Sequence, residues 1–179
     1  MEADHDSDGK IRAKMALPME SFSPGYMGER QQEADVRYVE LLLHVMKEIR
    51  SLGFRVIVVM AGHYPLLAHA RAAVELFNLQ SRDEATAWAC TGYELVRNEL
   101  PNAGDHAAAW ETSLMLALRP ELVDLSRLPS NPSTPLVGVR GQDPRRYASK
   151  EYGEQGIAAC VGAINTKIAE LLRRFDSSA

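Results

Sequence analysis

The chain has 179 residues, of which 46% are hydrophobic and 25% are charged, and its formal net charge is −4. This composition is typical of one globular domain with a full core, and it excludes disorder over most of the chain. The negative charge argues against a nucleic-acid partner, and no apolar stretch is long enough to span a bilayer. The acidic segment from Met1 to Asp6 is unlike a secretory signal, so we expect a cytoplasmic protein with no membrane or nucleic-acid partner.

Residues 1–16 are polar and predict a mobile tail ahead of a single domain over residues 17–179. The segment from Asp4 to Gly9 is similar to the start of a calcium-binding loop, but Met15 stands at the position where that loop needs a Glu. We interpret it as an acidic tail. Cys90 and Cys160 lie far apart in apolar contexts, which predicts two thiols and neither a disulfide nor a zinc pair.

Helical and strand patterns alternate through the first half of this domain. Apolar residues spaced by three or four predict a helix over 33–52 that ends at Gly53. The run from Val56 to Met60 predicts a strand over 54–60 that is buried on both faces. A helix over 66–79, opened by Pro65, and a strand over 86–91 follow. This alternation predicts an α/β fold of three layers, α/β/α, with a mostly parallel sheet.

The second half is less regular. A helix is expected from Asp105 or His106 to about Leu118, and the Pro- and Ser-rich segment 125–135 predicts a loop. Residues 136–139 predict a short strand, and Ser149 is a plausible N-cap for a long helix through Phe175. The chain therefore offers three or four strands, which is fewer than such a sheet usually contains.

The turn after the first strand predicts a functional site. His63 and Tyr64 follow the strand directly, between Gly62 and Pro65. Open α/β sheets bind ligands at the carboxyl ends of their strands, and an imidazole there suits metal binding or proton transfer. The hydroxyl of Tyr64 can contact a substrate, although packing is an equal alternative.

A second candidate group comprises Asp105, His106 and Glu111, which lie at the start of a predicted helix on the same sheet edge. With His63 they would suit a divalent metal or general acid–base chemistry. In the alternative interpretation, Asp105 caps the helix, His106 satisfies a backbone group and Glu111 is solvated.

Two arginines follow the turn signal Asp143-Pro144. Arg145 and Arg146 could bind an anion or pair with acids of a neighbouring subunit. Solvated surface arginines are the alternative.

Taken together, these blocks resemble the creatininase family of amidohydrolases over residues 17–175. The order and spacing of three blocks carry the resemblance. The blocks are Leu52-Gly53-Phe54 with the strand and Gly62-His63-Tyr64; Asp105-His106-Ala107 with Glu111-Thr112-Ser113; and Gly138-Val139 with Asp143-Pro144-Arg145 and Ala148-Ser149.

The resemblance implies a hydrolase with two divalent metal ions, zinc or manganese, that acts on a C–N bond of a small amide or cyclic amide. It implies that His63 is a metal ligand and that Glu111 lies behind the metal ligands or binds the metal weakly. His106 would give a proton to the leaving nitrogen or contact the substrate, and Asp105 would orient it. Family members commonly assemble as homohexamers, so a homo-oligomer is expected.

The chain departs from the family pattern at the metal site. Nothing before Leu17 resembles the family's Glu-x-His-Gly segment, and Pro65 and Ala109 stand where relatives place a second carboxylate. The site expected from this sequence is incomplete, because a catalytic zinc usually needs three protein ligands. We therefore expect either a fragment of a longer enzyme or a short paralogue, the latter being a non-catalytic small-molecule-binding or assembly domain on the same scaffold.

Overall fold

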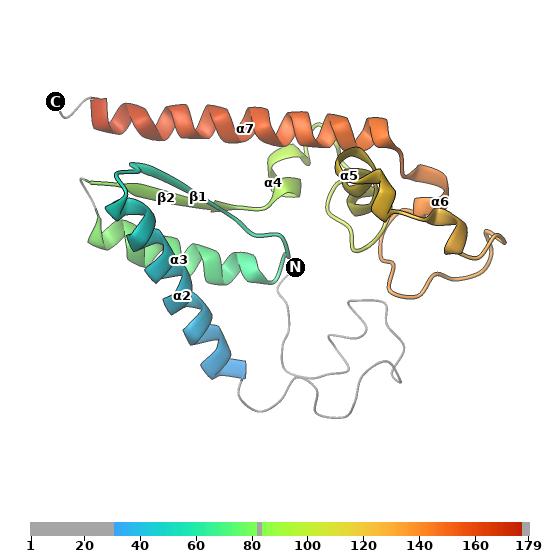
Figure 1. Cartoon of the computed structure of the whole chain (residues 1–179), viewed down its shortest axis with the longest axis horizontal. Coiled ribbons are helices and arrows are strands. Elements are labelled where there is room, and N and C mark those ends of the chain that lie inside the picture. The colour runs from blue at the N-terminus through green and yellow to red at the C-terminus, as the bar shows by residue number, and fades with distance from the viewer. Residues whose placement is uncertain (1–30, 82–83, 177–179) are drawn as a thin grey trace. The chain divides into compact units, whose positions relative to one another are not determined.

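The computed structural model describes residues 31–81 and 84–176, with side chains from Ala34 to Phe175 within these ranges. The predicted tail, residues 1–16, and its calcium-like segment lie outside them. The described residues form two compact units (Figure 1). We call residues 31–95 with 162–176 the sheet unit, and residues 96–161 the α5 unit.

The sheet unit has a parallel β-α-β unit at its centre. It comprises α2 (Gln31–Ser51), β1 (Val56–Met60), α3 (Leu66–Gln80), β2 (Thr86–Cys90), α4 (Gly92–Val96) and the C-terminal part of α7 (Lys150–Asp176). Val56 pairs with Thr86 and Met60 with Cys90, so the strands run parallel in full register. Parallel neighbours need a crossover connection, and α3 provides it. The predicted α/β class and both predicted strands are confirmed.

Helices cover both faces of this small sheet. On one face, α3 packs against β2 and α2, and Phe77, Ala73 and Met46 are almost fully buried in the shared core. On the other face runs the C-terminal part of α7 (Figure 1). The Arg55 guanidinium lies 4.4 Å from the ring centroid of Phe175 of this helix. The unit therefore has the expected three layers around two strands.

The turns at the ends of β1 follow the predictions. Gly53 has a φ of +89° just beyond α2, and its N–H donates to the carbonyl of Arg50 at 2.8 Å. Pro65 has helical angles, and the N–H of Leu66 donates to the carbonyl of His63 at 3.0 Å. His63 is therefore held in the backbone turn that leads directly into α3.

The α5 unit consists of short helices around the first part of α7. It contains α5 (Ala109–Leu118), η2 (Pro120–Leu122), η3 (Leu125–Arg127), α6 (Pro144–Tyr147) and α7 as far as residue 161. Ser149 caps α7 as predicted, because its Oγ accepts from the N–H of Tyr152 at 3.1 Å. The same residue donates its own N–H to the buried Oγ of Ser113 at 3.0 Å, which joins α7 to α5.

Two expectations for this part of the chain are wrong. The helix begins at Ala109 and not at Asp105 or His106, because Ala107 has a φ of +48°, which is not helical. Residues 136–139 form no strand, and Arg140 makes only an isolated antiparallel bridge with His106. Gly138 and Gly141, with φ of +74° and +145°, interrupt the extended chain there.

Neither of the two cysteines belongs to a disulfide; Cys90 is buried and Cys160 is half-buried. None of the described helices combines the length and the apolar character that a bilayer span requires.

The close contact between α5 and α7 makes a testable prediction at two glycines of one helix. A Cβ on Gly153 would lie 1.9 Å from the carbonyl oxygen of Ser113, whereas a Cβ on Gly162 meets nothing within 4 Å. We expect Gly153→Ala to lower the free energy of unfolding by about 1–3 kcal/mol through overpacking. Gly162→Ala should raise it by roughly 0.5–1 kcal/mol. Urea denaturation measures both, and equal stability of the two variants would contradict the contact.

Candidate functional site

The carboxyl ends of β1 and β2 gather aromatic side chains in the sheet unit. Since the strands are parallel, the turn after β1 and the start of α4 after β2 lie at one sheet edge. His63 is exposed there, and the rings of Tyr64 and Tyr93 lie 5.5 Å apart with an interplanar angle of 48°. Sequence reasoning missed Tyr93. Its position directly after the second strand, like that of Tyr64 after the first, is the signal that could have found it.

Tyr93 is a hydrogen-bond donor with a fixed position. Burial, and then its hydrogen bond with Tyr64, raise the pKa of Tyr93 to about 12, so the phenol stays protonated at neutral pH. The neighbouring Glu94 accepts from the N–H of Thr91 at 3.2 Å and from Arg71 at 2.9 Å. These bonds hold the first turn of α4, and they thereby hold Tyr93.

The turn that carries His63 is supported by a second histidine. The Nδ1 of His69 lies 3.3 Å from the carbonyl oxygen of Pro65, and its Nε2 lies 3.1 Å from the carboxylate of Asp35. Through His69, α2 and α3 brace the turn that presents His63 and Tyr64.

Two carboxylates brace the loop that carries His106 in the α5 unit. Asp105 accepts from the N–H groups of Trp110 at 2.7 Å and Glu111 at 3.1 Å, which are orphan donors of the first turn of α5. In return, Glu111 accepts from the N–H of Ala107 at 2.7 Å. The arrangement is that of a capping box with its cap displaced upstream.

These contacts show what Asp105 does for the fold. Burial raises the pKa of Asp105, and the backbone hydrogen bonds from Trp110 and Glu111 offset part of that rise. Asp105 therefore caps α5, as one of the two sequence interpretations stated. That it also orients His106 stays a prediction.

His106 is half-buried, and its backbone is held from the other side by residues 140–142, which we call the strap. His106 and Arg140 exchange two backbone hydrogen bonds of 2.9 and 2.8 Å, and Gln142 accepts from the N–H of Ala109 at 2.9 Å. A Cβ on Gly141 would lie 2.5 Å from the Cβ of Asp105. Only glycine fits there, and the strap therefore lies in contact with the loop.

The described side chains do not fit a metal centre by themselves. Within residues 34–81 and 84–175, no group of three or more His, Cys, Asp and Glu side chains is arranged to hold a metal ion. Of the two predicted ligands, Glu111 already accepts from the N–H of Ala107. A catalytic zinc needs about three protein ligands, so the metal roles of His63 and Glu111 stay predictions.

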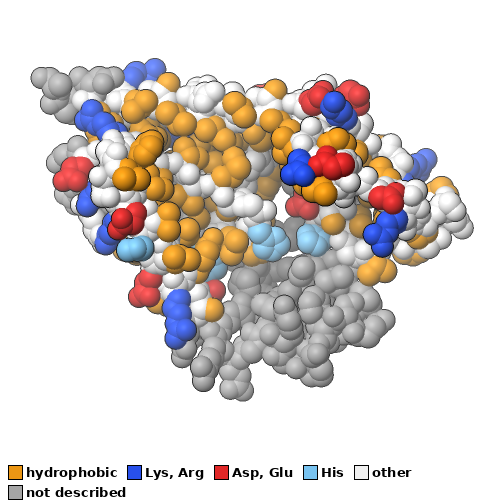
Figure 2. Space-filling model, viewed as in Figure 1, with side chains coloured by type: hydrophobic (Ala, Val, Ile, Leu, Met, Phe, Trp, Pro, Cys, Tyr) orange, Lys and Arg blue, Asp and Glu red, His pale blue; other side chains and the backbone are white. Residues whose placement is uncertain are grey.

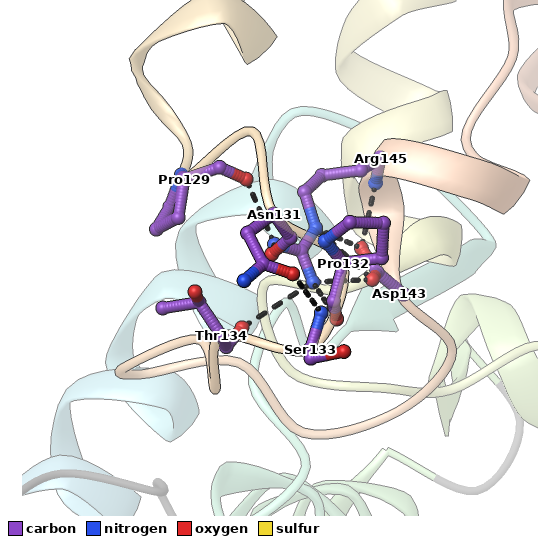
Figure 3. Close-up of polar contacts among 7 residues, drawn as sticks. All are labelled: Pro129, Asn131, Pro132, Ser133, Thr134, Asp143 and Arg145. Carbon is purple, nitrogen blue, oxygen red and sulfur yellow. Dashed lines mark hydrogen bonds and ion pairs between the residues drawn. The ribbon is translucent and has the colours of Figure 1, made fainter.

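Arg145 is not a solvated surface side chain, which corrects that interpretation of it. Its guanidinium is bound to the carboxylate of Asp143 and to four backbone carbonyls, as Figure 3 shows. The distances are 2.7 Å to Asp143, 2.8 Å to Pro129, 3.0 Å to Asn131, 3.0 Å to Pro132 and 3.4 Å to Thr134. We call this group the Arg145 knot. The guanidinium lowers the pKa of Asp143, while Arg146 is exposed.

Several known proteins are similar to this chain in fold and in sequence. The profile of the creatininase family, described as creatinine amidohydrolase, matches residues 34–168. A creatinine amidohydrolase of Pseudomonas putida is 31% identical over 157 residues, covering 70% of this chain and 59% of that protein. A crystal structure of creatinine amidohydrolase superposes with a TM-score of 0.62 at 25% identity, over 76% of this chain and 63% of that one. A manganese form of creatininase gives 0.59 at 24% identity, over 76% and 64%.

The fold and the match to the family profile define an α/β protein of the creatininase type. The chain belongs to the creatininase family. It spans about 59% of the length of the curated relative that it matches.

Glu111 offers a test between bracing and metal binding. Glu111→Gln keeps an oxygen that accepts from Ala107, so we expect nearly unchanged stability, whereas Glu111→Ala should lower the free energy of unfolding by about 0.5–1 kcal/mol. Denaturation together with hydrogen exchange at the Ala107 amide measures this. If Glu111 acts as a ligand instead, the two variants will lose bound metal to a similar extent.

The lowered pKa of Asp143 predicts a pH dependence of stability. Because the folded chain holds this pKa below the ordinary value of 3.8, the unfolded chain takes up the proton first as the pH falls. The contribution of Asp143 is therefore complete above that value, and it is lost as the pH falls through the folded-state pKa. We expect Asp143→Asn to be less stable than the parent at pH 7 and to approach it near about pH 2. Denaturant titrations at both pH values test this, and a constant difference would be evidence against the ion pair.

Proposed function

We propose that this chain is an amidohydrolase of the creatininase family that hydrolyses a C–N bond of a small amide or cyclic amide. The observation that carries the proposal is the extent of the family match. Residues 34–168 include both His63 at the end of β1 and the braced loop from Asp105 to Glu111. The activity of the relatives is the basis for the reaction class, and a creatininase variant solved with creatine supports a small-molecule substrate.

The side chains suggest a division of roles. An imidazole can move a proton near neutral pH, so His106 would donate to the leaving nitrogen. Its backbone is held by Arg140 on one side and by the loop that Glu111 braces on the other. Tyr64, whose hydroxyl accepts from the protonated Tyr93, would donate a hydrogen bond to a polar atom of the substrate.

A divalent metal, zinc or manganese, belongs to the proposal on the strength of relatives. One solved creatininase is a Zn–Zn form and another a manganese form. The described residues contain no cluster of three donors, so His63 would need ligands beyond them.

A specific observation favours a second candidate function, a non-catalytic small-molecule-binding or assembly domain. Glu111 is engaged in bracing its own loop, and Pro65 and Ala109 stand where the resemblance to the family implies a carboxylate. A scaffold with these replacements can keep the tyrosine pair for binding without retaining hydrolysis.

We also propose that the protein acts as a cytoplasmic homo-oligomer. In the described residues the sheet consists of β1 and β2 alone, so each strand has an edge that the other does not cover. Figure 2 shows hydrophobic side chains gathered over the sheet unit. The exposed large hydrophobic residues of this unit include Leu41, Val45 and Phe54. Contact between subunits would cover such a surface.

Metal analysis and hydrolysis assays on the purified chain test the proposal. Creatinine, creatine and a panel of small cyclic amides serve as substrates. We expect bound zinc or manganese, loss of metal in His63→Ala, and a kcat reduced about 10²- to 10⁴-fold in His106→Ala. His44→Ala, which changes an exposed histidine of α2, is the matched control. A chain with neither metal nor hydrolysis would favour the binding domain.

A further inference from the structure

The Arg145 knot closes a loop of the chain. The guanidinium contacts the carbonyl of Thr134 at one end of the segment and the carboxylate of Asp143 at the other. All of its donor nitrogens, Nε, Nη1 and Nη2, are engaged, and the Arg145 side chain is only 14% exposed. A group that joins both ends of a segment removes conformational freedom from everything between them.

The closed segment includes the strap. Arg140, which exchanges both of its backbone hydrogen bonds with His106, lies between the two ends that the guanidinium joins. Gly141 and Gln142 complete the contact with Asp105 and Ala109. The position of the His106 backbone therefore depends on a segment whose two ends meet at one side chain.

Few side chains can replace Arg145 in this position. A planar guanidinium carries five N–H donors in a fixed fork, and here its three nitrogens bind four carbonyls and a carboxylate (Figure 3). A lysine would keep the charge, but its three donors on one nitrogen cannot reach Asp143 and all four carbonyls. The ion pair with Asp143 neutralises a charge that would otherwise be partly buried.

We propose that Arg145 is a positioning residue for His106, and that it acts by closing the loop from Thr134 to Asp143 and thereby holding the strap against the His106 loop. The proton-transfer part of this inference rests on the proposed function. The positioning part does not, because it concerns the order of His106 in the chain without substrate.

Hydrogen exchange and NMR on the full chain test this proposal. In Arg145→Gln, the amides of His106 and Arg140 should exchange about tenfold faster or more, and the ring signals of His106 should broaden or shift. Arg145→Lys should give a smaller change in the same direction. Arg146→Gln, which changes the exposed neighbour of Arg145, should leave these signals unchanged. The Ala87 amide of β2, which donates to the Asn78 side chain, serves as an internal reference in every variant.

Unchanged exchange and ring signals at His106 in a folded Arg145→Gln variant would overturn the proposal. If that variant does not fold, hydrogen exchange in the parent chain tests the proposal instead. The amide of Thr134 donates to the carbonyl of Asn131, which is part of the Arg145 knot. This amide and that of His106 should then exchange with the same protection factor, and independent opening would refute the link.

An activity assay separates this inference from the proposed function. With a hydrolysed substrate in hand, Arg145→Gln should lower kcat and leave KM nearly unchanged, with partial rescue in Arg145→Lys. If no substrate is hydrolysed but His106 loses order in Arg145→Gln, the positioning role stands and the hydrolase proposal fails. If hydrolysis is found but Arg145→Gln alters neither kcat nor the order of His106, the positioning role fails and the hydrolase proposal stands.

Discussion

Parallel pairing of β1 with β2 is the constraint on which the sheet unit depends. Because α3 returns the chain to the same end of the sheet, both strands finish at one edge. The turn with His63 and Tyr64 and the helix start with Tyr93 are therefore neighbours, although they are far apart in sequence. The core of Phe77, Ala73 and Met46 holds α3 and α2 against this pair of strands. These core side chains hold the strands in position but do not themselves lie at the sheet edge that carries His63, Tyr64 and Tyr93.

In the α5 unit, the loop that carries His106 is held mainly by hydrogen bonds to backbone groups. Asp105 and Glu111 satisfy the N–H groups at the start of α5 and in the loop, and Arg140 pairs with the backbone of His106. A carboxylate that stabilises a loop in this way is less available to a metal ion. The same residues that suggest chemistry in the sequence are thus required by the local fold, whatever chemistry they also perform.

Much of the architecture could be predicted from local patterns. The β-branched run of β1, Gly53 beyond α2 and the cap Ser149 were each recognisable, because each reflects a conformational preference of the residue itself. The start of α5 was not. Asp105 caps α5 from three residues before the N-cap position, where Ala108 stands, so the sequence shows no capping residue at that position. A left-handed Ala107 cannot be anticipated from its residue type. The strand expected over 136–139 does not form because its few apolar residues meet no partner strand among the residues that the structure describes, and the glycine angles redirect the chain.

The sequence by itself determined the fold class, the two strands and the family, because hydrophobic period, turn residues and the order of motifs are local properties of the chain. Tertiary structure alone decided that Tyr93 joins Tyr64, and that Arg145 is an internal cross-link and not a surface charge. It also decided that Glu111 braces its own loop. These roles depend on which carbonyls and N–H groups the folded backbone brings within hydrogen-bond distance, and a residue's type does not reveal that distance.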